Sequence, residues 1–259
     1  MAHVTPNGRA RVLDAGGREL SPCPAERALK LVATGRAALA SEEPLTIRLP
    51  YAVTLPPTHE PQRKAPVTPG TPLLLHICCG PCATYPVPHL REMGFDVWGY
   101  WYNPNIQPGE EHARREQSAY LYAGRVGLPL ASRPYEPERY ALAVRGHEER
   151  PARCRACYRL RLEEAALEAQ RRGIESFTTT LLISPYQDQA ALREIGEEAA
   201  AHYGRRFIFE NLRRGWAERS RLAREYGLYL QQYCGCLFSL AERRRAQAAQ
   251  RALVPEERT

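Results

Sequence analysis

Seven of the eight cysteines in this chain stand in three short clusters. The clusters are Cys78-Cys79-Gly80-Pro81-Cys82, Cys154-Arg155-Ala156-Cys157 and Cys234-Gly235-Cys236. Thiols that serve only as small apolar core groups would be scattered, whereas thiols separated by zero, one or two residues can converge on one small object when the loops meet. The spacing therefore predicts a metal site or a redox site.

The composition limits the classes of protein that could carry such a site. A chain of 259 residues and 29.3 kDa can hold one sizeable core and a small extra domain. It has no apolar stretch of about 18 residues, as a membrane span requires, and no signal pattern at its start. We therefore expect a cytoplasmic protein with no membrane partner. Thiols stay reduced there, which favours metal binding or catalytic redox work over structural disulfides.

The net charge indicates the kind of partner. The formal charge is +7 and the pI is about 9.1. An excess of positive charge attracts polyanions, because phosphate groups release their counterions when cationic side chains replace them. The charge is thus compatible with RNA as a partner.

A proline-rich stretch at residues 56–70 divides the chain. Repeated proline removes backbone donors and favours an extended linker. We predict a small α+β domain at residues 1–55, a linker at 56–70 and a larger domain at 71–259. In the small domain the pattern predicts a strand at 10–13, a helix at 25–34 and a strand at 45–49.

Strands alternate with helices in the larger domain. The expected strands are at residues 73–77, 96–102 and 176–181, and the expected helices run through about Met93 and over 112–126, 157–172, 189–203 and 216–226. This alternation predicts an α/β fold with a mostly parallel sheet in three layers. Ligands of such sheets bind beyond the carboxyl ends of the strands, where Cys78, Cys79 and Cys82 would lie.

The layout of strand, loop and helix at residues 73–93 resembles the adenine nucleotide α-hydrolase-like group. In that group the loop normally holds the phosphates of ATP. Here cysteines occupy the loop, and the chain contains no Gly-rich Walker motif with its lysine. We therefore do not expect ATP chemistry.

From Leu73 to Ser239 the chain resembles the epoxyqueuosine reductases of the QueH type. Five motifs carry the resemblance: HICCGPC at 76–82, YNPNI at 102–106, RCRACYRL at 153–160, TTLLISPY at 179–186 and QYCGCLFS at 232–239. The resemblance implies an iron–sulfur enzyme that reduces the epoxide of epoxyqueuosine at the wobble position of tRNAs with GUN anticodons. That reaction is the last step of queuosine formation.

The number of thiols matches such chemistry. A 4Fe-4S cluster takes four thiolates from a protein, and the pairs Cys78/Cys79 and Cys154/Cys157 supply that number. Cys234 and Cys236 then remain as a candidate redox pair, and the family pattern points to the same division. A disulfide between them would close a small, strained ring and be easily reduced.

A second division of the thiols stays open. In this alternative Cys82, Cys234 or Cys236 binds a second, mononuclear iron beside the cluster, and that iron acts as a Lewis acid on the epoxide oxygen.

Polar side chains follow two of the predicted strands. Tyr102, Asn103 and Asn105 follow the strand at 96–102, where they could bind a base or ribose or form an ordinary Asn-Pro turn. The second set follows the strand at 176–181 and consists of Thr179, Thr180, Ser184 and Tyr186. Its hydroxyl groups could hold a phosphate or a diol, or could cap the next helix.

The N-terminal domain resembles a different family. Residues 9–50 are similar to the small RRXRR (PLMP) domain at the head of IscB-type RNA-guided nucleases, through VLDAGGRELSPC at 12–23 and PLTIRL at 44–49. The basic run at 25–30 has fewer arginines than that family's name implies. We expect either an RNA-binding accessory domain or a packing module.

Three functional classes follow from these observations. The first is the tRNA epoxide reductase, which needs a partner that donates electrons and that the sequence does not identify. The second is a structural zinc protein that binds nucleic acid, with the same cysteines as closed tetrahedral ligands. The third is an iron–sulfur electron carrier.

Overall fold

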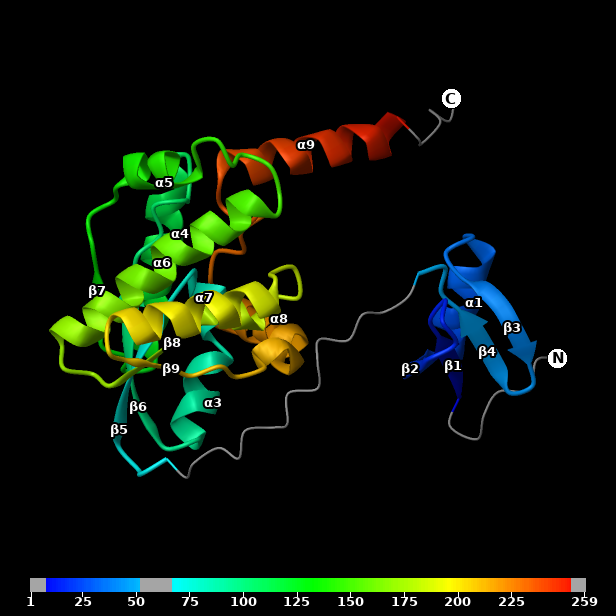
Figure 1. Cartoon of the computed structure of the whole chain (residues 1–259), viewed down its shortest axis with the longest axis horizontal. Coiled ribbons are helices and arrows are strands. Elements are labelled where there is room, and N and C mark those ends of the chain that lie inside the picture. Colours follow the sequence, from blue (N-terminus) through cyan, green and yellow to red (C-terminus); the bar gives the residue numbers. More distant parts are fainter. Residues whose placement is uncertain (1–7, 52–66, 253–259) are drawn as a thin grey trace. The chain divides into compact units, whose positions relative to one another are not determined.

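The computed structural model describes residues 8–51 and 67–252. The chain divides into two compact units, Met1–Arg63 and Lys64–Thr259 (Figure 1). Most of the stretch predicted as a linker, residues 56–66, lies outside the described residues, as do residues 52–55 of the predicted small domain.

The N-terminal unit is a four-stranded sheet with one helix. Its elements are β1 (Arg9–Leu13), β2 (Glu19–Pro24), α1 (Ala25–Ala33), β3 (Ala38–Glu42) and β4 (Leu45–Arg48), and the strand order is β2-β1-β4-β3. The core is formed by side chains such as Ala10, Ala28 and Ile47. The sequence analysis did not predict β2, which contains two prolines, or β3. Both β2 and β3 are edge strands, where a missing backbone donor is tolerated.

The larger unit contains five parallel strands. They are β5 (Thr71–His76), β6 (Phe95–Trp101), β7 (Leu130–Ser132), β8 (Ser176–Thr179) and β9 (Arg206–Phe207). The strand order is β7-β6-β5-β8-β9, and each pair of neighbours is parallel. The α/β class with a parallel sheet is thus confirmed. The sequence did not predict β7 and β9, which are short edge strands.

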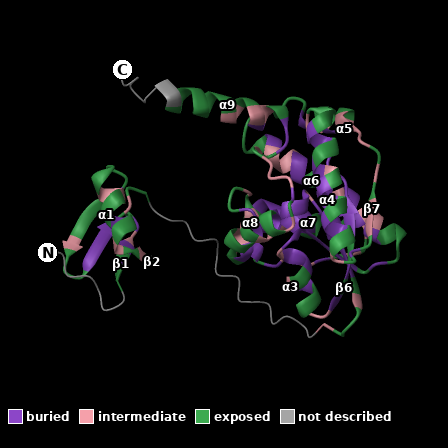
Figure 2. Cartoon of the chain, turned by 180° about the vertical axis from the view of Figure 1, so that it is seen from behind, coloured by how far each residue is buried: buried purple, intermediate pink, exposed green. Residues whose placement is uncertain are grey.

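Helices cover both faces of this sheet. They are α2 (Gly80–Ala83), α3 (Pro86–Glu92), α4 (Gly109–Arg125), α5 (Pro137–Val144), α6 (Ala152–Arg171), α7 (Gln189–His202), α8 (Trp216–Glu225) and α9 (Leu237–Ala252), with 3₁₀ turns η1 (Thr180–Ile183) and η2 (Leu212–Gly215). Leu74 of β5 packs with α6 and α7, whereas Leu73 and Leu75 pack with α3, α4 and α8. Figure 2 shows the buried residues gathered on the sheet and the inner helix faces. The predicted three layers are present.

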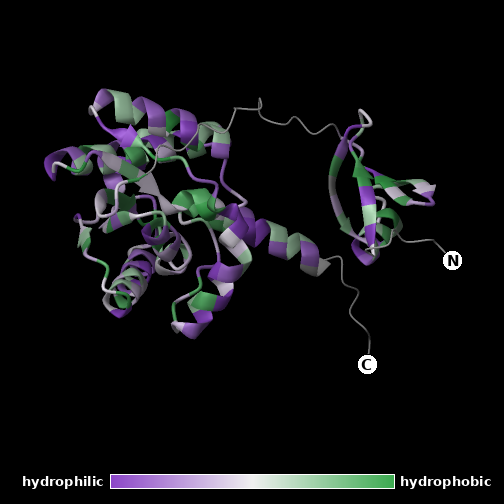
Figure 3. Ribbon diagram, turned by 90° about the horizontal axis from the view of Figure 1, so that it is seen from below, coloured by the Kyte–Doolittle hydropathy of each residue, from purple (hydrophilic) through white to green (hydrophobic). Residues whose placement is uncertain are grey.

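Two helical segments differ from the prediction. The helix expected through Met93 is divided into α2 and α3, because Pro86 cannot donate a hydrogen bond within a helix and begins a new one. Helix α9 was not predicted, and Figure 3 shows hydrophilic residues interspersed with hydrophobic ones along it. No helix within the described ranges is long and apolar enough to cross a membrane.

Candidate metal centre

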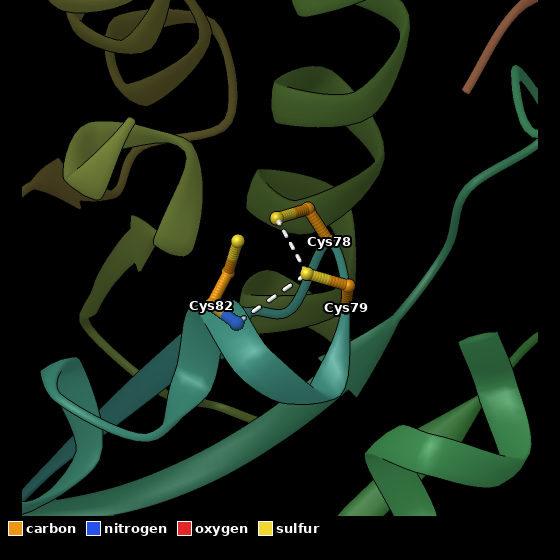
Figure 4. Close-up of side chains that lie close together, drawn as sticks. All are labelled: Cys78, Cys79 and Cys82. Atoms are coloured by element: carbon orange, nitrogen blue, oxygen red, sulfur yellow. Dashed lines mark hydrogen bonds between the residues drawn. The ribbon is translucent and has the colours of Figure 1, made fainter. Parts of the chain in front are cut away.

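The first cysteine cluster lies where strand β5 ends. The chain leaves β5 at His76, and Cys78 and Cys79 follow in the loop before the single turn of helix α2. Cys79 has an extended backbone, and its sulfur accepts a hydrogen bond of 3.3 Å from the backbone N–H of Cys82. The turn brings the three sulfur atoms within 4.8 Å of one another (Figure 4). The structure therefore adds Cys82 to the pair that the spacing had singled out.

Gly80 is needed in this turn because helix α4 packs closely against it. A Cβ atom on residue 80 would lie 2.5 Å from the carbonyl oxygen of Ser118 in α4. That distance is far shorter than a van der Waals contact, and both groups belong to rigid backbone. Any side chain at this position would displace the cysteine loop or the helix.

Neighbouring strand ends hold the cysteine loop in place. The backbone N–H of Cys78 donates a hydrogen bond of 2.9 Å to Oγ1 of Thr180, which follows β8. Nδ2 of Asn103, which follows β6, donates a hydrogen bond of 2.8 Å to the carbonyl oxygen of Ile77. The strand order reverses between β5 and β8. The cysteines thus occupy the switch point at which open parallel sheets bind ligands.

The three thiols are not equivalent. Hydrogen bonds from the thiols of Cys79 and Cys82 hold the pKa of Cys78 well below its usual value of 9.0. Burial raises the pKa of Cys79 to about 12, and the interactions with the other two sulfurs raise the pKa of Cys82. A bound metal ion would favour the thiolate at every sulfur that it contacts.

Two residues that the sequence analysis missed face these sulfurs. Nε2 of Gln231 lies 2.9 Å from Sγ of Cys79 and 3.8 Å from Sγ of Cys82. Nη1 of Arg219 lies 3.9 Å from Sγ of Cys82, and its guanidinium group lies over the ring of Trp216. Both come from segments more than a hundred residues away, so spacing could not have indicated them.

The other four clustered cysteines form a second group. Cys154 and Cys157 lie three residues apart on helix α6, and Cys234 and Cys236 lie in the loop before α9. Cys157 and Cys236 share one buried apolar cluster. Burial raises the pKa of Cys157 to about 12, Arg161 lowers it, and the nearby sulfurs of Cys234 and Cys236 raise it further. The structure thus places the second and third cysteine clusters close to each other.

The loop before α9 requires a glycine. Gly235 has a φ of +145°, and a Cβ atom there would lie 2.9 Å from Nδ2 of Asn105. Its carbonyl oxygen accepts a hydrogen bond of 2.9 Å from the backbone N–H of Gln107. The segment after β6 therefore holds the loop that carries Cys234 and Cys236.

All eight cysteines are free thiols in the structure. The disulfide expected between Cys234 and Cys236 is therefore not supported. The two sulfurs have different partners: Nε2 of Gln187 lies 3.6 Å from Sγ of Cys234, and the backbone N–H of Ser239 lies 3.4 Å from Sγ of Cys236. Cys234 is exposed and Cys236 is buried.

Most of the residues predicted to contact substrate are buried. Asn103 and Thr180 support the loop of the first cysteine cluster, and Thr179 Oγ1 lies 2.7 Å from Nδ1 of His76. Tyr102 and Asn105 are also buried, and the Tyr102 hydroxyl and the Asn105 side-chain oxygen have no hydrogen-bond partner among the described residues. Of these five side chains, Asn103 and Thr180 hold the loop of the first cysteine cluster directly.

The other two predicted substrate residues, Ser184 and Tyr186, follow η1 and differ in exposure. Ser184 is buried at the end of η1, and its hydroxyl accepts a hydrogen bond of 3.2 Å from the backbone N–H of Tyr186. The side chain of Tyr186 is 78% exposed, and its ring stands edge-on to Trp216 at 5.9 Å. Among the predicted substrate residues, Tyr186 is therefore the one open to a large ligand.

The donor set indicates what these thiols could hold. Soft thiolates select zinc, copper(I) and iron–sulfur clusters over magnesium or calcium. The sulfurs of Cys78, Cys79 and Cys82 could hold one metal ion. A 4Fe-4S cluster takes four thiolates and would need a member of the second group. Arg161 and Arg219 are buried beside the sulfurs, and no carboxylate in the described ranges pairs with either. An anionic metal–thiolate group would supply the missing counter-charge, so the residues fit such a group.

The fold and the site together define an α/β protein with a thiol-rich site that could bind a metal. A family model described as "Epoxyqueuosine reductase QueH" matches residues 73–242. This chain belongs to the epoxyqueuosine reductase QueH family.

Relatives and one solved structure resemble the chain. A protein named epoxyqueuosine reductase QueH from Thermotoga maritima is 39% identical over 184 residues, which cover 68% of this chain and 94% of the relative. One of the same name from Dehalococcoides mccartyi is 37% identical over 172 residues, with 66% and 93% covered. The crystal structure of a predicted tRNA methyltransferase subunit from Methanocaldococcus jannaschii has a TM-score of 0.43 and 12% identity, and covers 60% of this chain and 75% of its own.

Proposed function

We propose that this protein reduces epoxyqueuosine to queuosine at the wobble position of tRNAs with GUN anticodons. The proposal rests on one observation above all. Within the region that matches the family, residues 73–242, seven thiols gather in two groups, the first of them beside the carboxyl edge of the parallel sheet. We place the reaction in the cytoplasm, where thiols stay reduced.

We assign the metal group to the paired thiols. Cys78 and Cys79 would bind a 4Fe-4S cluster together with Cys154 and Cys157 of helix α6. Cys154 packs against the same core as Cys78 and Cys79, which supports this set. The alternative is that Cys82 ligates the metal, because its sulfur already lies with the first pair. When bound, the cluster would supply one-electron transfer.

We assign Cys234 and Cys236 to the delivery of electrons and protons. Removal of the epoxide oxygen as water leaves a carbon–carbon double bond and consumes two electrons and two protons. A dithiol can release both when it is oxidised, and an external low-potential donor would restore it. The exposed thiol of Cys234 is the one that a substrate could reach. The alternative role for either residue is ligation of a second, mononuclear iron.

We propose that tRNA approaches over the surface near η1. Tyr186 is exposed, and a base that leaves the anticodon stack can stack on an aromatic ring. Gln187 is next in sequence and contacts Cys234, so a base at Tyr186 would lie near that thiol. Ser184 would orient Tyr186, while Tyr102, Asn103, Asn105, Thr179 and Thr180 would hold the loops that carry the cysteines.

The remaining parts of the chain fit the same function. The strand order, with cysteines at the switch point, supports kinship with the adenine nucleotide α-hydrolase-like fold. In this chain thiols take the place of the residues that bind ATP in that fold. We propose that residues 1–55 form an RRXRR-like accessory domain that contacts RNA. Residues 71–259 would form the reductase domain, joined to it by the proline-rich segment 56–70.

Anaerobic turnover tests the proposal. The reconstituted protein is incubated with tRNA that carries epoxyqueuosine and with dithionite, and the nucleosides are analysed by mass spectrometry. We expect conversion to queuosine by loss of one oxygen atom, and no conversion by Cys157→Ala. A colourless protein that retains zinc would favour the structural zinc class. A brown protein without turnover would favour the electron carrier.

A further inference from the structure

Arg161 is a buried cation whose partners are unusual. It lies on helix α6 and is 2% exposed. Nη2 donates a hydrogen bond of 2.5 Å to Oδ1 of Asn103, and Nη1 lies 4.0 Å from Sγ of Cys157. In the part of the chain that the structure describes, Nε has no hydrogen-bond partner. Within residues 8–51 and 67–252, no carboxylate pairs with this guanidinium group.

Two of the other buried arginines in the unit have carboxylate partners, whereas Arg219, which lies beside Cys82, has none among the described residues. Arg115 pairs with Glu111 at 2.7 Å, and Arg153 pairs with Glu242 at 2.6 Å. A buried charge is costly unless an opposite charge and hydrogen bonds compensate it. For Arg161 the acceptors within reach are an amide oxygen and a sulfur. Its counter-charge must therefore come from thiolates or from what they bind.

The contacts of Arg161 connect the two pairs of proposed ligands. It stands four residues after Cys157, which places both side chains on the same face of α6. Asn103, which accepts from Arg161, donates through its own Nδ2 to the carbonyl oxygen of Ile77 at 2.8 Å. Ile77 immediately precedes Cys78. One short chain of contacts thus runs from the helix of Cys154 and Cys157 to the loop of Cys78 and Cys79.

We propose that Arg161 is a positioning residue that joins the two cysteine pairs and supplies the buried positive charge that sets the reduction potential of the metal group between them. The inference rests on the proposed function. A reduced cluster carries one more negative charge than an oxidised one, and a nearby cation in a medium of low dielectric stabilises it more. The charge of Arg161 therefore raises the reduction potential.

The test compares four reconstituted full-length proteins. These are the wild type, Arg161→Gln, Arg161→Lys and the matched control Arg159→Gln, which changes an exposed arginine two residues earlier on the same helix. Iron content and absorbance measure loading, and anaerobic dye-mediated titration followed by electron paramagnetic resonance measures the midpoint potential. Neither readout depends on turnover.

We expect Arg161→Gln to have a more negative midpoint potential. At a fixed solution potential, the ratio of reduced to oxidised cluster in Arg161→Gln should be about tenfold lower than in the wild type. This corresponds to a shift of the midpoint potential by about 59 mV for a one-electron couple. Arg161→Lys should recover most of the potential, because it keeps the charge, and Arg159→Gln should match the wild type. If Arg161→Gln fails to load iron, loading and a near-wild-type potential in Arg161→Lys would still support the charge role.

Two results would overturn the inference. One is an unchanged potential in Arg161→Gln, and the other is equal loss of iron in Arg161→Lys and Arg161→Gln. A wild-type protein that binds no iron–sulfur cluster would contradict the proposed function itself, so the two failures are distinguishable.

Discussion

Nη1 of Arg115 donates a hydrogen bond of 3.0 Å to the carbonyl oxygen of Cys234, and this contact fastens the C-terminal cysteine loop to helix α4. Nη2 donates to the carbonyl oxygen of Tyr233 at 3.1 Å, and Glu111 neutralises the guanidinium group. A residue outside every cysteine cluster thus determines where the third cluster lies.

Replacement of Arg115 should therefore greatly reduce the stability of the larger unit. In Arg115→Ala the buried carboxylate of Glu111 loses its partner, which we expect to cost about 3 kcal/mol or more of unfolding free energy. Urea unfolding followed by tryptophan fluorescence measures the loss, since Trp98, Trp101 and Trp216 all lie in the larger unit. The neighbouring variant Arg114→Ala is the control and should stay close to the wild type. Equal stabilities of the two variants would show that the contacts of Arg115 do not stabilise the unit.

The ligand assignment predicts a difference between cysteines that lie close together. Because Cys78, Cys79, Cys154 and Cys157 supply four thiolates, Cys157→Ala should lose the cluster absorbance and all turnover. Cys82→Ala should retain a cluster, although its sulfur lies within 4.8 Å of those of Cys78 and Cys79. Iron and sulfide analysis after anaerobic reconstitution measures both. A cluster that survives in Cys157→Ala but not in Cys82→Ala would move Cys82 into the ligand set.

The third cluster should be separable from the first two. If Cys234 and Cys236 relay electrons or bind a separate iron, Cys234→Ser and Cys236→Ser should abolish turnover and leave the cluster absorbance in place. The check is absorbance together with nucleoside analysis of the same sample. Complete loss of iron in either variant would make that residue a ligand of the cluster.

The N-terminal unit should affect affinity rather than chemistry. A protein that begins at residue 67 should keep its cluster and its turnover at saturating tRNA, but bind tRNA more weakly. Each phosphate contact that is lost removes about one unit from the slope of log affinity against log salt. Binding measured at several salt concentrations gives the slope for both proteins. Identical slopes and affinities would show that the unit makes no contact with tRNA.

His112 should make the stability of the larger unit depend on pH. Its Nε2 accepts a hydrogen bond from Nε1 of Trp101 at 3.3 Å, so the folded protein keeps the ring neutral. Burial, and then the charge of Arg115, lower the pKa of His112 from 6.5 to about 4. Below pH 6.5 the unfolded chain binds the proton more readily than the folded protein. His112 therefore contributes stability that is present above pH 6.5 and is lost as the pH falls toward 4.

Urea unfolding at pH 7.5 and pH 4.5 measures this contribution. We expect the wild type to lose more stability between these two values than His112→Gln does, because glutamine does not titrate. Glu116 faces His112 at 3.9 Å and titrates in both proteins, so the difference between them isolates the histidine. An equal loss in both proteins would show that His112 plays no part.

The sequence alone predicted a thiol-based site and the class of fold. Thiols at spacings of zero, one or two residues report a metal or redox site wherever they lie in space, because a helical turn or a tight loop brings such neighbours together. Strands and helices that alternate at 73–77, 96–102 and 112–126 likewise follow from local periodicity. Both properties depend on short segments of the sequence, so they can be predicted without the structure.

Only the tertiary structure decided which side chains surround the thiols. Gln231 reaches Cys79 across 152 residues, and Arg161 reaches Asn103 across 58. Such contacts depend on how β5, β6 and β8 lie side by side and on which helices cover them, and no local pattern encodes that packing. For the same reason no local pattern could show that Asn103, Thr179 and Thr180 are buried, because the order of strands in the sheet determines whether a strand end faces solvent or a neighbouring loop.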